Sequence, residues 1–201
     1  MKDESSVTKG LAAGVAGGLV ASLVMNQFQA LLGKLMQDQS RSHGAQSLQQ
    51  GSPDHGIGRE LQERGSDAPD DNAAVRAGNA VSVFVFNHKL SKPEKEVAGA
   101  IAHYAMGATS GAIYGAVAEI VPLTTMAEGV PFGAAVWAIA DEAIVPALGL
   151  SKSASKYPLS THAYSFASHL VFGLTTEVVR RNIRRALASK RDGGVTSRTS
   201  H

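Results

Sequence analysis

The amino-acid sequence predicts an all-α polytopic membrane protein with about four transmembrane helices and a long hydrophilic loop between helices one and two. Residues 10–33 contain no charged side chain, and residues 97–118 and 157–176 contain none apart from histidines. Each run reaches the length of about 20 residues that a helix needs to cross a hydrocarbon core about 30 Å thick. Two of these runs also carry glycine at every fourth position, which favours close helix packing in a bilayer.

Composition sets the outer limits on what the chain does. Its 201 residues suit one domain, and its mean hydropathy of -0.03 averages apolar runs with a polar central stretch. The lack of cysteine excludes disulfide bonds and thiolate metal sites. The net charge of +2 is too balanced to indicate a nucleic-acid partner, so we expect the lipid bilayer as partner and no nucleic acid.

The predicted organisation is a single membrane domain over residues 1–201. We place the crossings at about 10–33, 97–118, 127–148 and 157–177, the hydrophilic loop at about 36–96, and a basic C-terminal tail at 178–201. The first run has the short charged start of a secretory signal peptide. However, no small-residue cleavage pattern follows it, and apolar residues resume after Gln27, so we interpret it as a helix that is retained.

The hydrophilic loop falls into two parts. Residues 37–71 are rich in turn formers and lack sustained periodicity, so we expect them to be exposed and mobile. Asn72 is suited to cap a helix, and an apolar stretch interrupted by Arg76 follows it. Because that stretch is too short and too mixed to span a membrane, we expect an interfacial helix that packs on the bundle.

The third predicted crossing contains two adjacent acids, Asp141 and Glu142. If the apolar run ended before them, it would be too short to cross, so we expect both acids inside the membrane. A central acid costs about 2.5 to 3.5 kcal/mol on insertion scales, whereas each large aliphatic residue returns about 0.3 to 0.6. The acids should therefore face the bundle interior, paired or protonated. Pro146 removes a backbone donor at the same level and predicts a kink.

The fourth predicted crossing places His162, Ser165 and His169 on one narrow face, which should point toward protein. A basic tail follows it, with seven basic residues and one acidic residue after Glu177. The apolar residues between its arginines predict an amphipathic extension on an anionic membrane surface. By the positive-inside rule we place both termini in the cytoplasm, although three lysines beside the second crossing argue the other way.

Four stretches resemble, in order and spacing, the YagU-like family of small bacterial inner-membrane proteins. They are KGLAAGVAGGLVAS, HYAMGATSGAIYGAVAEIVP, AVWAIADEAIVPALGLS and HAYSFASHLVFGLTTEVVRRNIR. The resemblance covers residues 9–35 and 103–183, and it is looser near residues 72–87. It implies a polytopic protein of the bacterial inner membrane whose biochemical activity is not established. No catalytic or ligand-binding residue transfers with it.

Two sets of residues are candidates for a functional role. The helix-packing candidates are the glycines at four-residue spacing in the first two crossings: Gly10, Gly14, Gly18, Gly107, Gly111 and Gly115. The intramembrane polar candidates are the acids and histidines of the later crossings and their ends: His103, Glu119, Asp141, Glu142, His162, His169 and Glu177. The glycines indicate close packing, or alternatively a sliding contact in a transporter.

The polar candidates have three interpretations: interhelical hydrogen bonds and ion pairs, a proton or ion pathway, or a metal site. His162 and His169 lie two turns apart, about 10 Å, which is too far to share one metal without a bridging helix. His162 alternatively lies at the membrane surface beside two tyrosines. No protease, phosphate-binding or dinucleotide-binding motif is present, so we expect no enzymatic activity, no catalytic residue, no cofactor and no metal.

The sequence therefore predicts a non-enzymatic component of the inner membrane. The alternative is a proton-linked or ion-linked carrier, or an acid-stress factor, that uses the buried acids and histidines. Four helices rich in small residues enclose little pathway, so transport would favour a homo-oligomer.

Overall fold

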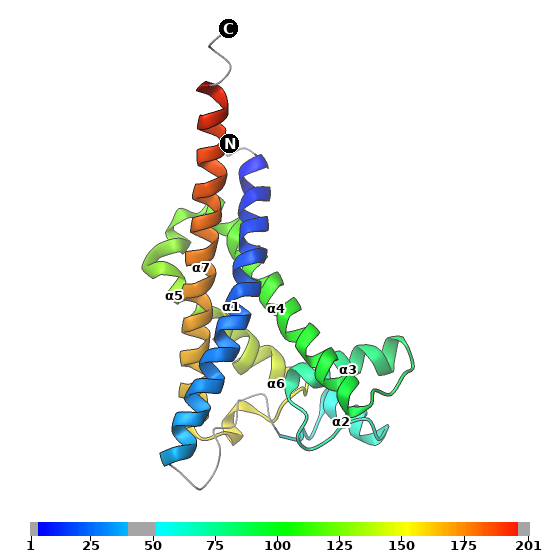
Figure 1. Cartoon of the computed structure of the whole chain (residues 1–201). Coiled ribbons are helices and arrows are strands. Elements are labelled where there is room, and N and C mark those ends of the chain that lie inside the picture. The colour runs from blue at the N-terminus through cyan, green and yellow to red at the C-terminus, as the bar shows by residue number, and fades with distance from the viewer. Residues whose placement is uncertain (1–3, 40–50, 197–201) are drawn as a thin grey trace.

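The computed structural model describes residues 4–39 and 51–196 (Figure 1). All regular structure in these ranges is helical, which confirms the all-α prediction. The elements in chain order are α1 (Glu4–Gln39), α2 (Gly56–Glu63), α3 (Ala73–Val85), α4 (Lys92–Ile120), η1 (Pro122–Gly129), α5 (Val130–Val136), η2 (Trp137–Ile144), α6 (Val145–Ala147), η3 (Ala154–Lys156) and α7 (Leu159–Thr196).

The long elements form a bundle of four antiparallel passes: α1, α4, the chain from α5 through α6, and α7. In Figure 1 the start of α1 and the end of α7 lie at one end of this bundle, which we call the terminal end, and α2 and α3 lie at the other, the loop end. Helix α1 packs along both α4 and α7, α3 packs on α4, and α5 packs on α7. Helix α1 therefore lies between α4 and α7 and packs on both.

Six glycines form the contact between α1 and α4, which we call the glycine seam. The seam pairs Gly10 with Gly115, Gly14 with Gly111, and Gly18 with Gly107. A side chain added at Gly107 would collide with the Ser22 hydroxyl, and one added at any of the other five would collide with backbone of the opposite helix. The glycines of the first predicted crossing therefore lie against those of the second, and the two backbones approach without side chains between them.

A second close approach joins the third pass to α7. A side chain added at Gly173 would collide with the carbonyl of Gly129, and one at Gly133 with the carbonyl of His169. Gly129 and Gly133 are also four residues apart, the same spacing as in the glycine seam. Two glycine contacts thus hold the bundle together.

The third pass changes helix type along its length. After α5 the chain forms a π-helix over η2, where Val145 donates its N–H to the carbonyl of Ala140, five residues earlier. Pro146, which lacks an N–H, follows directly in α6. The expected kink at Pro146 thus takes the form of a widened turn, and this turn contains Asp141 and Glu142.

The segment from residue 51 to 71 corrects the expectation of an exposed, mobile loop. It contains α2, whose Leu61 is fully buried against Ala80 and Val83 of α3. Residues 40–50 of the predicted loop lie outside the described residues. The helix cap at Asn72 is confirmed, because its side chain accepts a hydrogen bond from the N–H of Val75.

Arg76 anchors this loop-end region. Although it interrupts an apolar stretch of the sequence, its side chain is 0% exposed. It donates to Asp67 over 2.8 Å and to the carbonyls of Gly51 and Leu150 over 2.9 and 3.1 Å. A buried arginine needs such partners, so α3 is tied to three loop segments at once.

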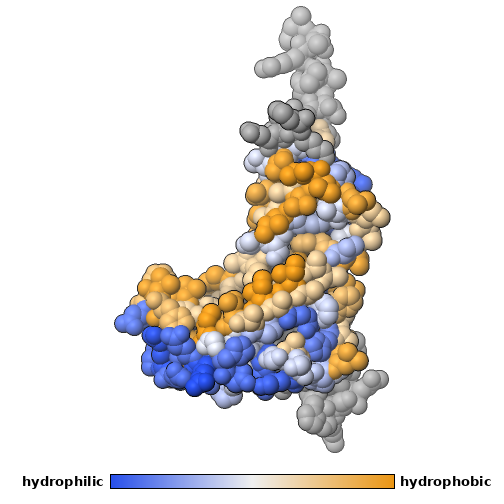
Figure 2. All heavy atoms as spheres, turned by 180° about the vertical axis from the view of Figure 1, so that it is seen from behind, coloured by the Kyte–Doolittle hydropathy of each residue, from blue (hydrophilic) through white to orange (hydrophobic). Residues whose placement is uncertain are grey.

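The surface is hydrophobic along one part of the molecule and hydrophilic at one end of it. Figure 2 shows hydrophobic residues over much of the long part of the bundle and hydrophilic residues gathered over the loop end. Large aliphatic side chains are exposed on several passes, for example Leu23 at 50%, Ile113 at 61% and Ile139 at 58%. Within the described residues, two helical stretches are long and apolar enough to cross a membrane, Ser6–Lys34 and Pro122–Ala147.

Candidate functional site

The structure separates the seven polar residues predicted from the sequence into three groups. Glu119 and Glu177 belong to an ion-pair cluster at the terminal end. His103, Asp141 and His169 line a cavity inside the bundle. Glu142 and His162 form a pair of their own. The seven candidates therefore do not meet at one place, and each group has its own chemistry.

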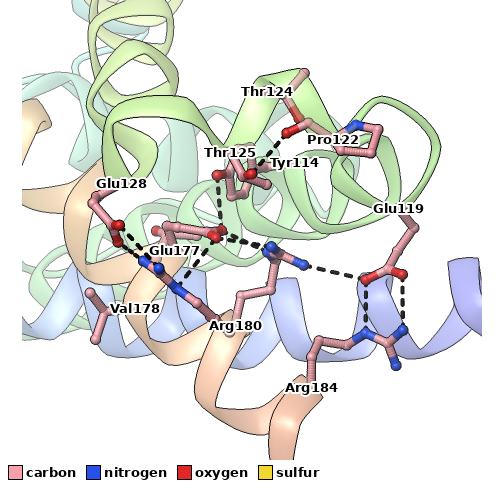
Figure 3. Close-up of polar contacts among 12 residues, drawn as sticks. Tyr114, Glu119, Pro122, Thr124, Thr125, Glu128, Glu177, Val178, Arg180 and Arg184 are labelled. Atoms are coloured by element: carbon pink, nitrogen blue, oxygen red, sulfur yellow. Dashed lines mark hydrogen bonds and ion pairs between the residues drawn. The ribbon is translucent and has the colours of Figure 1, made fainter. Parts of the chain in front are cut away.

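The ion-pair cluster is centred on Glu177 of α7, whose side chain is only 2% exposed (Figure 3). Arg180 donates to the Glu177 carboxylate from Nε over 2.7 Å and from Nη2 over 2.9 Å. The hydroxyl of Tyr114 on α4 donates to the same carboxylate over 2.9 Å. This buried acid thus has a bidentate arginine and a hydroxyl as partners, which offset the cost of its burial.

Glu119 continues the cluster across to α1. Arg184 donates to it from Nε and Nη2 over 2.7 and 2.9 Å, and the Ser6 hydroxyl donates over 2.7 Å. Arg180 links the two acids through a 3.3 Å contact with Glu119. Burial tends to raise the pKa of Glu119, but the hydrogen bonds from Arg184 and Ser6 outweigh it and hold this pKa below its ordinary value.

These contacts correct the interpretation of the basic tail. Arg180 and Arg184 were predicted to face an anionic membrane surface, but both turn inward and pair with acids. Arg181 pairs with Glu128 in η1. The cluster joins α1, η1, α4 and α7, and its acids already have several donors each. Its chemistry is therefore that of a structural clamp.

The Glu142 and His162 pair lies between η2 and α7. Nδ1 of His162 is 2.7 Å from the Glu142 carboxylate, and its Nε2 is 3.2 Å from the carbonyl of Ala154. Both side chains are 21% exposed. His162 therefore ties α7 to η2 and η3 and retains some access to the surroundings.

The third group surrounds Asp141 in the π-helix, which is 3% exposed. The Ser165 hydroxyl of α7 donates to its carboxylate. Nδ1 of His169 lies 3.8 Å from that carboxylate and 2.9 Å from the carbonyl of Ser165. The adjacent acids thus have different neighbours, because the widened turn directs Asp141 toward the interior and Glu142 toward His162.

Asp141 and His169 line a cavity of about 100 Å³ together with His103 of α4 and Ser22 of α1. The Ser22 hydroxyl and Nε2 of His103 are buried and have no hydrogen-bond partner. Such unpartnered groups are uncommon in native proteins and indicate an occupant such as water or a ligand. This cavity is the candidate functional site, since it combines titratable groups with unused hydrogen-bonding capacity.

The cavity is not arranged as a metal centre. Among the residues that the structure describes, no group of three or more His, Asp or Glu side chains is arranged to hold a metal ion. Its chemistry is that of hydrogen bonding and proton exchange, for which imidazole and carboxylate are suited.

Sequence reasoning missed Ser6 and Ser22 of α1. They lie four residues before Gly10 and four after Gly18, so the four-residue spacing itself extends to both. The matching positions on α4 are Glu119 and His103, each four residues beyond a glycine. Ser6 contacts Glu119, and Ser22 and His103 line the same cavity. The glycine seam therefore ends at the clamp on one side and at the cavity on the other.

Comparison with known proteins places this architecture in one family. No curated protein matches the chain, and no solved structure does. Residues 60–178 match a family described as protein of unknown function, DUF1440. The matched region includes the second half of α2, all of α3 and α4, the π-helix with Asp141, and α7 as far as Val178. Because the match covers more than half of the sequence, the chain belongs to the DUF1440 family of proteins of unknown function.

Proposed function

We propose that the protein is a four-span component of the bacterial inner membrane without enzymatic activity. The observation that supports the proposal is the placement of apolar side chains outside and charged side chains inside, which is the reverse of the usual arrangement in water. Large aliphatic side chains cover the outside of the bundle, while the buried set includes Glu177, Arg180 and Asp141. In water this arrangement is unfavourable, whereas in a bilayer it places apolar surface against lipid and charge against protein.

The packing of the helices supports four crossings. Helix α1 contains one of the two apolar stretches, and the glycine seam sets α4 beside it from residue 103 to 115. Helix α7 also packs on α1, where Phe172 contacts Ala21 and Met25. If α1 crosses the membrane, these parts of α4 and α7 lie at the same depth. The resemblance to YagU-like proteins supports the inner membrane as the location.

A membrane extraction experiment tests integral insertion. We expect the protein to stay in the membrane pellet after washing with high salt and then with alkaline carbonate, because its apolar surface is in contact with lipid. Recovery in the supernatant would contradict the proposal.

The topology is tested separately. The basic tail supports a cytoplasmic location for both termini, by the positive-inside rule. A reporter fused after Arg191 should give a cytoplasmic signal, and one inserted near Gly56 should give a periplasmic signal. The reverse pattern would overturn the orientation and leave membrane insertion untouched.

A second candidate function, a proton-linked or ion-linked role, is favoured by the cavity. Asp141, His169 and His103 are titratable groups around one interior space, and two polar atoms there lack partners. A proton pathway through a bundle requires such groups within reach of water.

Reconstituted vesicles with an internal pH dye test this role. Under an imposed potential, the wild-type protein should carry protons, and Asp141→Asn should abolish the flux because the isostere cannot exchange a proton. Glu142→Gln is the matched control, since its carboxylate pairs with His162 and does not line the cavity. Equal flux from wild-type and protein-free vesicles would exclude the proton role and keep the first proposal.

A further inference from the structure

The unpartnered atoms of the cavity define what it is able to bind. A side chain added at Gly107 would collide with the Ser22 hydroxyl, so this hydroxyl lies directly against α4. Nε2 of His103 is buried beside it and has no partner either. An imidazole nitrogen and a hydroxyl both form hydrogen bonds with a hydroxyl group. The cavity thus offers one free imidazole nitrogen and one free hydroxyl.

An apolar groove adjoins the cavity on the outside of the bundle. It lies between α4 and the third pass, has a volume of about 560 Å³, and is lined by apolar residues such as Ile113, Phe132 and Ile139. Met106, Ser110, Val136 and Ala140 line both the groove and the cavity. The groove on the apolar outer surface and the polar cavity therefore adjoin at these four residues.

We propose that the cavity and the groove form one binding site for a single-chain lipophilic molecule with an uncharged hydroxyl head group. The hydroxyl donates to Nε2 of His103 and accepts from the hydroxyl of Ser22, while the hydrocarbon chain lies in the groove. This inference rests on the proposed membrane insertion, because the groove opens toward lipid only when α4 and η2 lie in the bilayer.

Size and charge select this class of ligand. The cavity of about 100 Å³ suits a small head group. The Asp141 carboxylate disfavours an anionic head. The groove falls within the range of about 300 to 1,000 Å³ that is typical of small-molecule pockets.

Photolabelling of the full-length protein in detergent tests the proposal. The probe is hexadecanol with a diazirine in the middle of its chain. We expect saturable labelling that maps to groove residues such as Ile113 and Ile139, competed by unlabelled hexadecanol and much less by hexadecane. The difference between the two competitors measures the contribution of the head group.

Two matched pairs of variants locate the head and the chain. Ser22→Ala should weaken competition by hexadecanol about 5-fold to 10-fold, the effect of one hydrogen bond. Ser168→Ala, a buried serine on α7 that does not line the cavity, should leave it unchanged. Ala135→Trp should block the groove, whereas Ala138→Trp, an exposed position that does not line the groove, should not.

Three outcomes would overturn the proposal: labelling that does not saturate, labelling spread evenly to exposed lipid-facing residues such as Ile101, or equal competition by hexadecane. If Ala135→Trp fails to fold, the Ser22 and Ser168 pair still decides the result. Alkaline extraction separates this proposal from the proposed function. An extracted protein refutes both, whereas an integral protein without saturable labelling refutes only the ligand site.

Discussion

The two ends of the glycine seam contain polar groups of opposite character. At the terminal end, Glu119 and Glu177 each accept several hydrogen bonds from arginine and hydroxyl donors. At the other end, the Ser22 hydroxyl and Nε2 of His103 have no partner. Both ends are buried and both join α1 to α4, so the difference lies in how fully the polar groups are paired.

The comparison distinguishes a structural polar group from a binding group. A satisfied network fixes one arrangement of the helices, and removing a member leaves a buried charge unpaired. An unsatisfied group destabilises the empty protein and becomes favourable when a ligand or water supplies its partner. We therefore expect substitutions at the clamp to affect folding, and substitutions at the free cavity atoms to affect binding.

The largest effect should come from breaking the clamp. Arg180→Ala removes both strong donors of Glu177, which is 2% exposed, and should lower the free energy of unfolding by about 3 to 5 kcal/mol. Thermal unfolding in detergent, together with protein abundance in membranes, measures the loss. Arg185→Ala is the control, because Arg185 is exposed and should change stability by less than about 0.5 kcal/mol. Similar values for both variants would show that the clamp contributes little.

The next effect concerns the seam between the two ends. Gly111→Leu forces a side chain against the backbone of Gly14 and Gly18, so the helices must separate. We expect a loss of about 1 to 3 kcal/mol or more, the cost of overpacking a tight contact. Ala105→Leu, on the exposed face of α4, should be tolerated. Equal tolerance of both changes in a folding assay would mean that α1 and α4 do not pack through these glycines.

A smaller difference in stability is expected between substitutions of two serines, one beside Asp141 and one in the cavity lining. Ser165→Ala removes the hydroxyl that donates to the buried Asp141 and should cost about 1 to 3 kcal/mol. Ser22→Ala removes a hydroxyl without a partner, so its stability should stay equal or rise slightly. Unfolding of the two variants in the same detergent decides the matter. A large loss in Ser22→Ala would show that its hydroxyl already has a structural partner.

The smallest effect is expected at the exposed loop end, where the pKa of His55 depends on its neighbour Asp54. The hydrogen bond that Nδ1 of His55 donates to the Asp54 carboxylate raises the pKa of His55 above its ordinary value of 6.5. The protonated pair therefore stabilises the fold fully below pH 6.5, and this contribution disappears as the pH rises through the raised pKa. An NMR titration should give His55 a pKa above 6.5, and Asp54→Asn should bring it back toward 6.5. An unchanged pKa in the variant would exclude Asp54 as the cause.

Much of the fold was predictable because the length of an apolar run and the spacing of its glycines are properties of a single helix, which the sequence shows directly. The uncharged run at residues 10–33 predicts α1. The four-residue spacing predicts which glycines of α1 and α4 lie at a helix contact, but not which glycines they meet. The same spacing occurs on both helices, so periodicity alone did not decide between an α1 to α4 contact and a contact with a second copy. That choice depends on tertiary packing.

The candidate site was less predictable, for a physical reason. Glu119 is separated from Arg184 by 65 residues, and the sequence contains no signal for an ion pair at that distance. Consecutive arginines after an apolar run are compatible with contact with a membrane surface as well as with ion pairs inside the protein. The interpretation of the tail was wrong for this reason. Arg76 was missed likewise, because its partner Asp67 and the carbonyls around it meet only after the loop has folded.

The four-residue repeat of the seam leaves its register ambiguous. If α1 slid along α4 by one repeat, about 6 Å, Gly14 would meet Gly115 and Gly18 would meet Gly111, so two of the three glycine pairs would survive. The glycines therefore permit close packing in more than one register. The hydrogen bond between Ser6 and Glu119 selects one register, because only that one brings the serine hydroxyl within 2.7 Å of the carboxylate.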